Sequence, residues 1–341
     1  MPMNSLSIRV STKFVDATDG DDYWRAATRP FYVTERTSRD VPLQGAMTGS
    51  TVGTSLIGET TFNSQDYFRN RRLIAESELE DQYIVQAWIS GEMIGDADGT
   101  DFSVQPSDVS FLDLGKPLRA SALTDPDRAG RTITLLAPRT LVEAASHGRS
   151  LHGTVLRGAS AMVLTQCLQS VSRALPHLDK TAAAQYEDVI AALLKASLST
   201  DPGALQPEFS PRTDPDLRAR ALTHIVEHLG ESWLSPVTIC ATLSVSRAQL
   251  YRAFQHDGGI AQVIRRKRLE HAYREVTAPE PENLSIEDVS RRWGFTSKTQ
   301  FVRAFDSFYG ITPSRARAEG RRTIGDPSID RLHRHLTTLG P

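Results

Sequence analysis

The segment Gly294–Arg317 reads GFTSKTQFVRAFDSFYGITPSRAR, and part of it has a counterpart upstream in the chain. Ser246–Phe254 (SRAQLYRAF) and Ser297–Phe305 (SKTQFVRAF) share serine, arginine, alanine and phenylalanine at an offset of 51 residues. A short helical pattern and a tight turn precede each copy: Val237–Leu243 with Ser244–Val245, and Ile286–Trp293 with Gly294–Thr296. Helix, short turn and second helix form a helix-turn-helix unit, so the repeat predicts two such units in tandem.

The spacing within each copy has physical reasons. Ser246 and Ser297 stand where a helix needs an N-cap, because a hydroxyl can accept a hydrogen bond from a free backbone N–H. A small residue is needed where the two helices of a unit cross, and Cys240 and Ser290 occupy that position. The residues expected to face the core lie four apart: Leu250 with Phe254, and Phe301 with Phe305.

The opposite faces of the second helices are the candidate DNA-reading surfaces. Arginine there can bond guanine O6 and N7 in a major groove, although a solvated helix face is the plain alternative for Arg252 and Arg303. The candidates are Arg247, Ala248, Tyr251 and Arg252 in the first unit, and Lys298, Thr299, Val302 and Arg303 in the second.

A helix is also predicted between the units, over Ile260–Val276 (IAQVIRRKRLEHAYREV), with prolines at 279 and 281 ending it. The basic block Arg265–Arg268 cannot all lie on one side of a helix. We expect Arg265 and Arg266 to contact DNA phosphates and the rest of the block to be solvated.

Charge is divided unevenly along the 341 residues. Residues 213–322 hold 17 basic and 13 acidic side chains, a net +4, whereas the remainder holds 22 and 28, a net −6. This favours a polyanionic partner for the C-terminal part, although chance variation can produce such a split. The N-terminus lacks the basic head and apolar core of a signal peptide, and a run of 18 apolar residues is absent from the sequence. We therefore expect a cytoplasmic protein that is not in a membrane.

The first 150 residues have the pattern of short strands separated by turns, which predicts a small barrel or sandwich. Tyr83 and Trp88 point to opposite faces of one strand, so only one of them can line an interior that binds a small, apolar or aromatic effector. The expected strands are Tyr83–Ile89, Phe102–Val104, Val109–Leu112 and Thr132–Leu136.

Two amphipathic helices follow, in residues 151–198. Their apolar faces can pack on the sheet domain or form a homodimer interface, and the pattern leaves both open. The faces comprise Val155, Ala159, Met162, Val163 and Cys167 within Leu151–Leu175, and Val189, Ile190, Leu193, Leu194, Ser197 and Leu198 in the next helix. Four prolines between Ser199 and Pro215 then predict a linker.

The second unit resembles the signature of the AraC/XylS family of transcription regulators. The match rests on Gly294, Phe295, Ser297, Phe301, Arg303, Phe305, Gly310, Pro313 and Arg317. The likeness extends over Asp216–Ala318 and implies an all-helical domain whose two recognition helices enter adjacent major-groove segments. More faintly, Ser103–Pro117 (SVQPSDVSFLDLGKP) resembles a strand–turn–strand passage of the family's cupin-like sensor domains, with Pro106 and Asp108 shaping the turn.

The resemblance implies an α+β chain: a cupin-like β-barrel with a helix pair, then an all-α domain with two helix-turn-helix units. We expect a sensor and dimerisation domain over 1–200 with its helix pair at 151–198, a linker at 201–215, a DNA-binding domain at 216–320 and a flexible tail at 321–341. The expected function is an effector-responsive activator that binds double-stranded DNA and contacts RNA polymerase. The alternative is a repressor or architectural DNA binder whose N-terminal domain only dimerises.

An enzyme is the remaining alternative, and the sequence disfavours it. A metal-dependent barrel needs clustered histidines and carboxylates, whereas the barrel region holds only His147, near its end. Alkyl-transfer repair would need a reactive cysteine, but Cys240 has the position of a packing residue and Cys167 lies on an apolar face without basic neighbours. No catalytic residue, metal or cofactor is predicted, and the effector-binding residues stay unknown.

Overall fold

The computed structural model of the protein describes residues 7–200, 215–254, 257–278, 284–319 and 336. The expected linker at 201–215 lies outside these residues except for Pro215, and the tail at 321–341 does so except for Leu336. The chain divides into two compact units, described separately below. We call the strands and helices up to residue 200 the sheet domain, and the helices from residue 215 to 319 the helical domain. Among the described residues, no helix has the length and apolarity that crossing a membrane requires.

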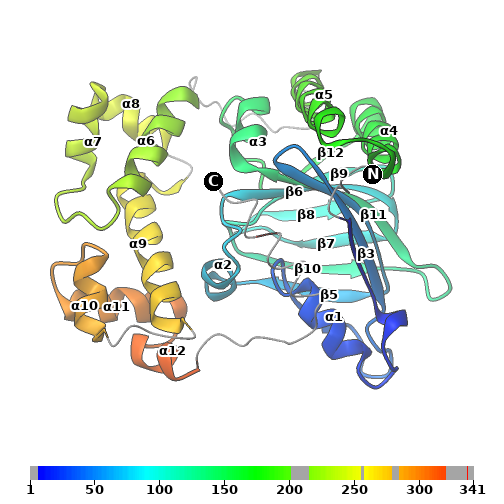
Figure 1. Cartoon of the computed structure of the whole chain (residues 1–341), viewed down its shortest axis with the longest axis horizontal. Helices are drawn as coiled ribbons and strands as arrows, with labels where there is room; N and C mark the ends of the chain where they lie inside the picture. The colour runs from blue at the N-terminus through cyan, green and yellow to red at the C-terminus, as the bar shows by residue number, and fades with distance from the viewer. Residues whose placement is uncertain (1–6, 201–214, 255–256, 279–283, 320–335, 337–341) are drawn as a thin grey trace. The chain divides into compact units, whose positions relative to one another are not determined.

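The sheet domain is built from two antiparallel sheets (Figure 1). The first has the order β1 (Ser7–Ser11), β3 (Gly45–Val52), β4 (Ser55–Phe62), β11 (Gly130–Pro138), β6 (Gln82–Ser90), β9 (Val109–Asp113) and β12 (Thr154–Leu156). The second has the order β2 (Val33–Arg36), β5 (Gln65–Arg69), β10 (Leu118–Leu123), β7 (Glu92–Asp96) and β8 (Asp101–Val104). The four predicted strands are confirmed as β6, β8, β9 and β11. The fold class is confirmed as well, and the predicted barrel or sandwich takes the form of two open sheets that enclose a common core.

Strand alternation gives the first sheet two buried faces. On β6, Ile84 and Trp88 face the second sheet, whereas Val85 and Ala87 face the helices that cover the other side. Those helices are α3 (Arg139–Ala145), α4 (Gly158–Ala174) and α5 (Lys180–Thr200). Two further helices, α1 (Gly20–Thr28) and α2 (Arg71–Ser77), belong to the same domain.

For the first amphipathic helix, the predicted apolar face is not the one that packs on the sheet. Residues 154–156 form the edge strand β12, so α4 begins only at Gly158. Its buried positions are Ala161, Leu164, Thr165, Leu168 and Val171, which lie against the sheet and α5. Met162 and Val163 are instead exposed, as is Val189 on α5. The sequence of α4 thus holds two overlapping apolar stripes, and the one that contains Leu164 and Leu168 is buried.

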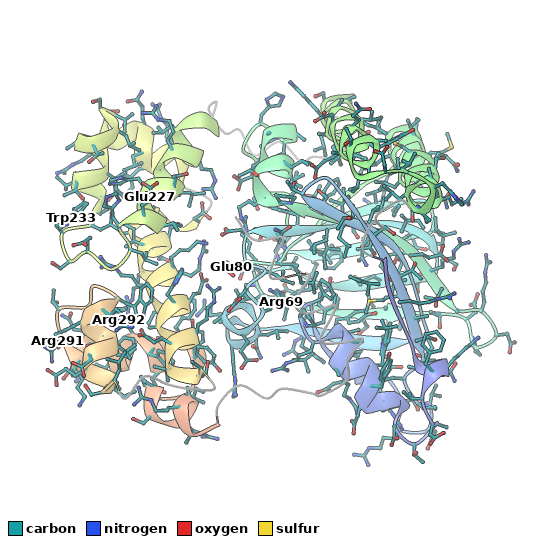
Figure 2. All side chains as sticks on the ribbon, in the orientation of Figure 1. Arg69, Glu80, Glu227, Trp233, Arg291 and Arg292 are labelled. Atoms are coloured by element: carbon teal, nitrogen blue, oxygen red, sulfur yellow. The ribbon has the colours of Figure 1, made fainter. Side chains whose placement is uncertain are left out.

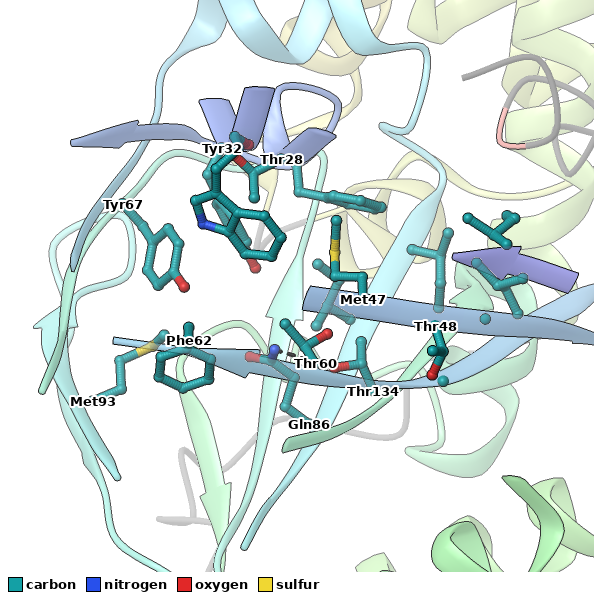
Figure 3. A pocket seen from close by; sticks show the side chains of 18 of the residues that line it. Thr28, Tyr32, Met47, Thr48, Thr60, Phe62, Tyr67, Gln86, Met93 and Thr134 are labelled. Carbon is teal, nitrogen blue, oxygen red and sulfur yellow. Dashed lines mark hydrogen bonds between the residues drawn. The ribbon is translucent and has the colours of Figure 1, made fainter. Parts of the chain in front are cut away.

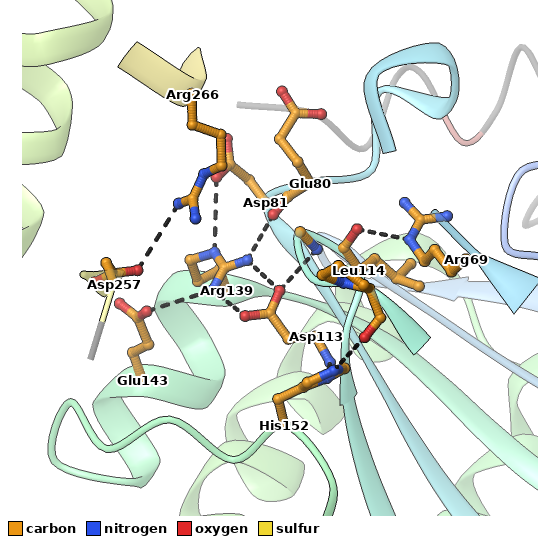
Figure 4. Close-up of polar contacts among 12 residues, drawn as sticks. Arg69, Glu80, Asp81, Asp113, Leu114, Arg139, Glu143, His152, Asp257 and Arg266 are labelled. Carbon is orange, nitrogen blue, oxygen red and sulfur yellow. Dashed lines mark hydrogen bonds and ion pairs between the residues drawn. The ribbon is translucent and has the colours of Figure 1, made fainter. Parts of the chain in front are cut away.

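A buried ion pair joins the end of β9 to the start of α3 (Figure 4). The Asp113 carboxylate accepts hydrogen bonds from both terminal nitrogens of Arg139, one at 2.7 Å, and from the Gly115 N–H at 2.8 Å. Desolvation opposes ionisation of Asp113, but the Arg139 guanidinium outweighs it and holds the pKa of that carboxyl well below its usual range. His152 Nδ1 accepts from the Asp113 N–H at 3.0 Å, and its Nε2 lies 2.9 Å from the Pro117 carbonyl oxygen. The cluster fixes the turn after β9 to the first turn of α3.

The helical domain contains α6 (Pro215–Glu227), α7 (Pro236–Leu243), α8 (Arg247–Ala253), α9 (Ile260–Thr277), α10 (Ile286–Arg292), α11 (Lys298–Tyr309) and α12 (Pro313–Glu319). Helices α6, α7 and α8 pack on one another, while α9 contacts α10 and α12. The helix predicted between the two units is therefore confirmed as α9.

Candidate nucleic-acid interface

The first helix-turn-helix unit consists of α7 and α8. Ser235 and Ser246 cap the two helices, and each forms a capping box with the third residue of its helix, Thr238 or Gln249. Between the helices, Ser244 adopts the left-handed conformation with φ of 55°. The N-cap predicted at Ser246 is confirmed, and the turn reverses the chain within three residues.

The second unit consists of α10 and α11. Ser297 is confirmed as the N-cap of α11, where its hydroxyl accepts from the Gln300 N–H at 3.4 Å. Gly294 makes the turn with φ of 68°, and a Cβ there would lie 2.7 Å from the Arg268 guanidinium. Glycine is thus required at this position both for the backbone and for the close approach of a charged side chain.

The aromatic core fixes the rotation of both second helices. Leu250, Phe254, Phe301 and Phe305 are all fully buried, as the sequence predicted. Phe305 stacks on Tyr273 of α9 with 5.7 Å between ring centroids. Since one face of α8 and of α11 is held inward, the other face is held outward.

The structure brings most of the candidate DNA-reading residues onto these outward faces. The exposed ones are Arg247, Ala248, Tyr251 and Arg252 on α8, and Lys298, Thr299 and Arg303 on α11. Val302 is only half-exposed. An open groove of about 640 Å³ also brings Arg303 of α11 together with Arg265 and Arg268 of α9. The groove is therefore lined by cationic side chains from two helices.

The basic block of α9 divides differently from the sequence expectation. Arg265 is exposed, but Arg266 is half-buried and lies 3.8 Å from carboxylate oxygens of both Asp257 and Glu270. Lys267 is buried, so the expectation that the rest of the block is solvated was wrong for it. A role of Arg266 at phosphate would require it to leave these carboxylates.

Arg268 is a structural residue that the sequence analysis missed. Its guanidinium donates to the carbonyl oxygens of Leu229 at 3.0 Å, Gly294 at 3.1 Å and Glu231 at 2.7 Å. These bonds tie α9 to the loop after α6 and to the turn of the second unit. The helical period could have indicated an inward position for Arg268, because it lies four residues after the inward-facing Ile264 and therefore on the same helix face.

Two further contacts fix the helices around α9. Arg218 of α6 pairs with Asp257 at 2.6 Å, and both side chains are 8% exposed. Glu275, near the end of α9, accepts from the Trp293 indole N–H at 2.5 Å and pairs with Arg292. Figure 2 shows Arg292 beside the exposed Arg291 on α10. The first helix-turn-helix unit is thereby joined to α6, and the second to α9.

The sheet domain holds a cavity of about 90 Å³ between its two sheets (Figure 3). Trp88 lines it, whereas Tyr83 faces α3 and α4, which decides the alternative that the sequence left open. Its wall is mainly apolar and aromatic, with Trp24, Tyr32, Phe62, Tyr67 and Met93 among the lining residues. A cavity of this size holds several waters or one small organic molecule.

The cysteines and histidines show packing roles. Burial raises the pKa of the Cys167 thiol, which lowers the reactive thiolate fraction. His224, Glu227 and His228 bring atoms of the metal-ligating type within 4.8 Å of one another. The two imidazoles contact each other in a tilted arrangement with 4.3 Å between ring centroids, and the ring centroid of His228 lies 5.2 Å from that of Trp233, labelled in Figure 2. We interpret this group as the packing of the loop between α6 and α7.

Two helix-turn-helix units joined by one helix, next in sequence to a double-sheet domain, define a two-domain DNA-binding transcription regulator. Residues 239–319 match the family model described as a helix-turn-helix domain, and residues 30–199 match the one described as an AraC-binding-like domain. The chain belongs to the AraC/XylS family of transcription regulators.

Solved structures are similar as well. The AraC-like transcriptional activator CuxR superposes with a TM-score of 0.54 at 24% identity, over 79% of this chain and 96% of that one. This likeness shows a shared fold. Unsaturated fatty acid-bound ToxT from Vibrio cholerae strain SCE256 matches with a TM-score of 0.43 at 14% identity, over 80% and 98% of the two chains.

Proposed function

We propose that the protein is an effector-responsive transcription activator that reads two adjacent major-groove segments with α8 and α11. The observation that carries this proposal is the outward face of α11, where Lys298, Thr299 and Arg303 are exposed beside the groove that also holds Arg265. The matching face of α8 supplies the second set of contacts. Arg265, and Arg266 once released from its carboxylates, contact phosphate and position the protein on the duplex.

Arg303→Ala is expected to weaken binding to a selected operator by about 1–3 kcal/mol, or about five- to 150-fold, because the side chain reads a base. The operator is obtained by selecting bound sites from random-sequence DNA, and affinity is measured by gel-shift titration. Arg173→Ala is the matched control, since Arg173 is exposed on α4 and its loss changes charge equally. An unchanged operator affinity for Arg303→Ala would remove this residue from the reading surface.

We further propose that the chain forms a homodimer through the helix pair in residues 151–198. Met162 and Val163 of α4 and Val189 of α5 are each about half exposed, and exposed apolar groups gathered on one helix pair favour association. A second copy is the natural occupant, because two-fold dimers are the commonest assemblies of soluble proteins.

Val163→Glu is expected to shift the protein from dimer to monomer, because each copy would bring a charge into the apolar contact. Light scattering after size-exclusion chromatography measures the mass. Gln166→Glu, an exposed change on the same helix, should leave the dimer intact. A wild-type protein that is monomeric at every concentration tested would contradict the proposed interface.

Activation implies a contact with RNA polymerase. Transcription with purified polymerase, on a template carrying the selected operator upstream of a promoter, tests the direction of regulation. A rise in transcript on adding the protein supports an activator, and a fall supports the repressor alternative.

A further inference from the structure

The cavity between the sheets has polar atoms without partners. The Tyr32 hydroxyl and the Gln86 Oε1 are both buried, and neither has a hydrogen-bond partner among the described residues. The Gln86 Nε2 is already used, because it donates to the Thr134 hydroxyl at 3.3 Å. Figure 3 shows Tyr32 and Gln86 on opposite walls of the cavity. A buried hydroxyl and a buried carbonyl that bond nothing are costly in an empty pocket, and a ligand can satisfy both.

Both indole donors and one threonine hydroxyl at the cavity are already satisfied. The Trp24 indole N–H donates to Gln65 Oε1 at 2.7 Å, and that of Trp88 donates to the Ser110 hydroxyl at 3.1 Å. The Thr28 hydroxyl lies 2.7 Å from that of Thr34. The free pair, one hydroxyl donor and one amide acceptor, therefore defines the polar part of a complementary ligand.

None of the described residues that line the cavity carries a charge. The buried Arg69 is outside the lining, and its guanidinium donates to the carbonyls of Leu114, Pro30 and Phe31. Burial raises the pKa of Tyr32, which keeps its hydroxyl protonated as a donor. A carboxylate or ammonium group would lose its hydration here without a charged lining residue to pair with, so ionised ligands are disfavoured.

We infer that this cavity binds one small, uncharged, largely apolar molecule whose polar group accepts a hydrogen bond from Tyr32 and donates one to Gln86 Oε1. A primary amide meets both requirements, and an alcohol or phenol does so with its single hydroxyl where that group reaches both walls. Aromatic rings of the lining, such as Phe62 and Trp88 at 5.7 Å between centroids, pack on the apolar part. This inference rests on the proposed effector response and assigns the chemical class of the effector.

Matched neutral and anionic probes small enough for the cavity test the class: propionamide against propionate, and butyramide against butyrate. Binding to the full-length protein is followed by quenching of tryptophan fluorescence, since Trp24 and Trp88 line the cavity. We expect at least one amide to bind saturably and at least about tenfold more tightly than its carboxylate. Equal or tighter binding of a carboxylate overturns the inference, as does the failure of both amides to quench.

Tyr32→Phe separates a ligand contact from a structural role. Loss of the hydroxyl should lower the affinity for the amide by about three- to tenfold. The melting temperature of the ligand-free protein should stay equal or rise, because an unpartnered buried hydroxyl is removed. Tyr186→Phe on the exposed side of α5 is the matched control and should change neither value. Unchanged amide affinity in Tyr32→Phe contradicts the assigned contact. Gel-shift binding to the selected operator is measured in the same samples, so that intact operator binding without ligand binding rejects the effector class alone.

Discussion

Asp113→Asn is expected to lower the free energy of unfolding of the sheet domain by about 3–5 kcal/mol, because it leaves the Arg139 guanidinium buried without its main counter-charge. The Asp113 side chain is 1% exposed and that of Arg139 is 12% exposed, so water cannot replace the lost carboxylate. Asp81 and Glu143 lie farther from the guanidinium, at 3.7 Å each, and compensate only in part. Urea unfolding of the full chain at neutral pH, followed by tryptophan fluorescence, measures the change.

The loss of stability caused by Asp113→Asn should depend on pH. The folded-state pKa of Asp113 is depressed, so its stabilising contribution is complete above the unfolded value of about 3.9 and is lost as the pH falls through the folded value. The difference in unfolding free energy between wild type and Asp113→Asn should therefore be constant from neutral pH to about pH 5 and shrink below about pH 4. Asp22→Asn removes a carboxylate that is 91% exposed and should cost less than about 0.5 kcal/mol. A loss below about 1 kcal/mol for Asp113→Asn would contradict the role of the buried pair.

Phe305→Ala is expected to cost about 3–5 kcal/mol, because it empties the centre of the second helix-turn-helix unit. Phe305 is fully buried, and its ring lies within 5.7 Å of those of Tyr273, Phe301 and Tyr309. Hydrogen exchange of the full chain should show lost protection in α10 and α11 with the sheet domain unchanged, and operator binding should fall with it. Phe14→Ala makes the same truncation at an exposed site and serves as the control. Retained protection of α11 would show that its packing does not depend on this ring.

The helical domain could be predicted closely because its signals are local. Serine caps at 246 and 297, a glycine turn and aromatic residues four apart each specify backbone within a few residues, and they agree with one another. The strands could also be predicted, since alternation and turn residues are local too. The order of the strands in the two sheets could not, because the pairing of β1 with β3 and of β2 with β5 depends on contacts across long stretches of chain.

In the candidate site, too, the features with local sequence signals could be predicted and those that depend on long-range contacts could not. Outward positions on α8 and α11 followed from the inward ones, but the partners of Arg266 and Arg268 did not. A run of four basic residues is ordinarily solvated or bound to phosphate, and only the packed structure shows Arg268 bonded to three carbonyls. The unpartnered hydroxyl of Tyr32 and Oε1 of Gln86 could not be predicted from the sequence either. They face one cavity only because the fold places β6 and the segment after α1 across it.

We propose that α8 and α11 are held at a fixed separation and enter successive major-groove segments on one side of the DNA. Helix α9 has 18 residues and spans about 27 Å at 1.5 Å per residue. With the width of the flanking units added, we expect the recognition helices to lie roughly one DNA turn apart, about 34 Å.

Footprinting on the selected operator, with the two half-boxes moved apart by five base pairs, tests this claim most directly. Five base pairs are about half a turn, so the insertion rotates one box to the far side of the duplex. We expect protection of both boxes on the original operator and loss of protection at one box after the insertion. Equal protection of both boxes on the altered DNA would contradict a rigid pair of recognition helices.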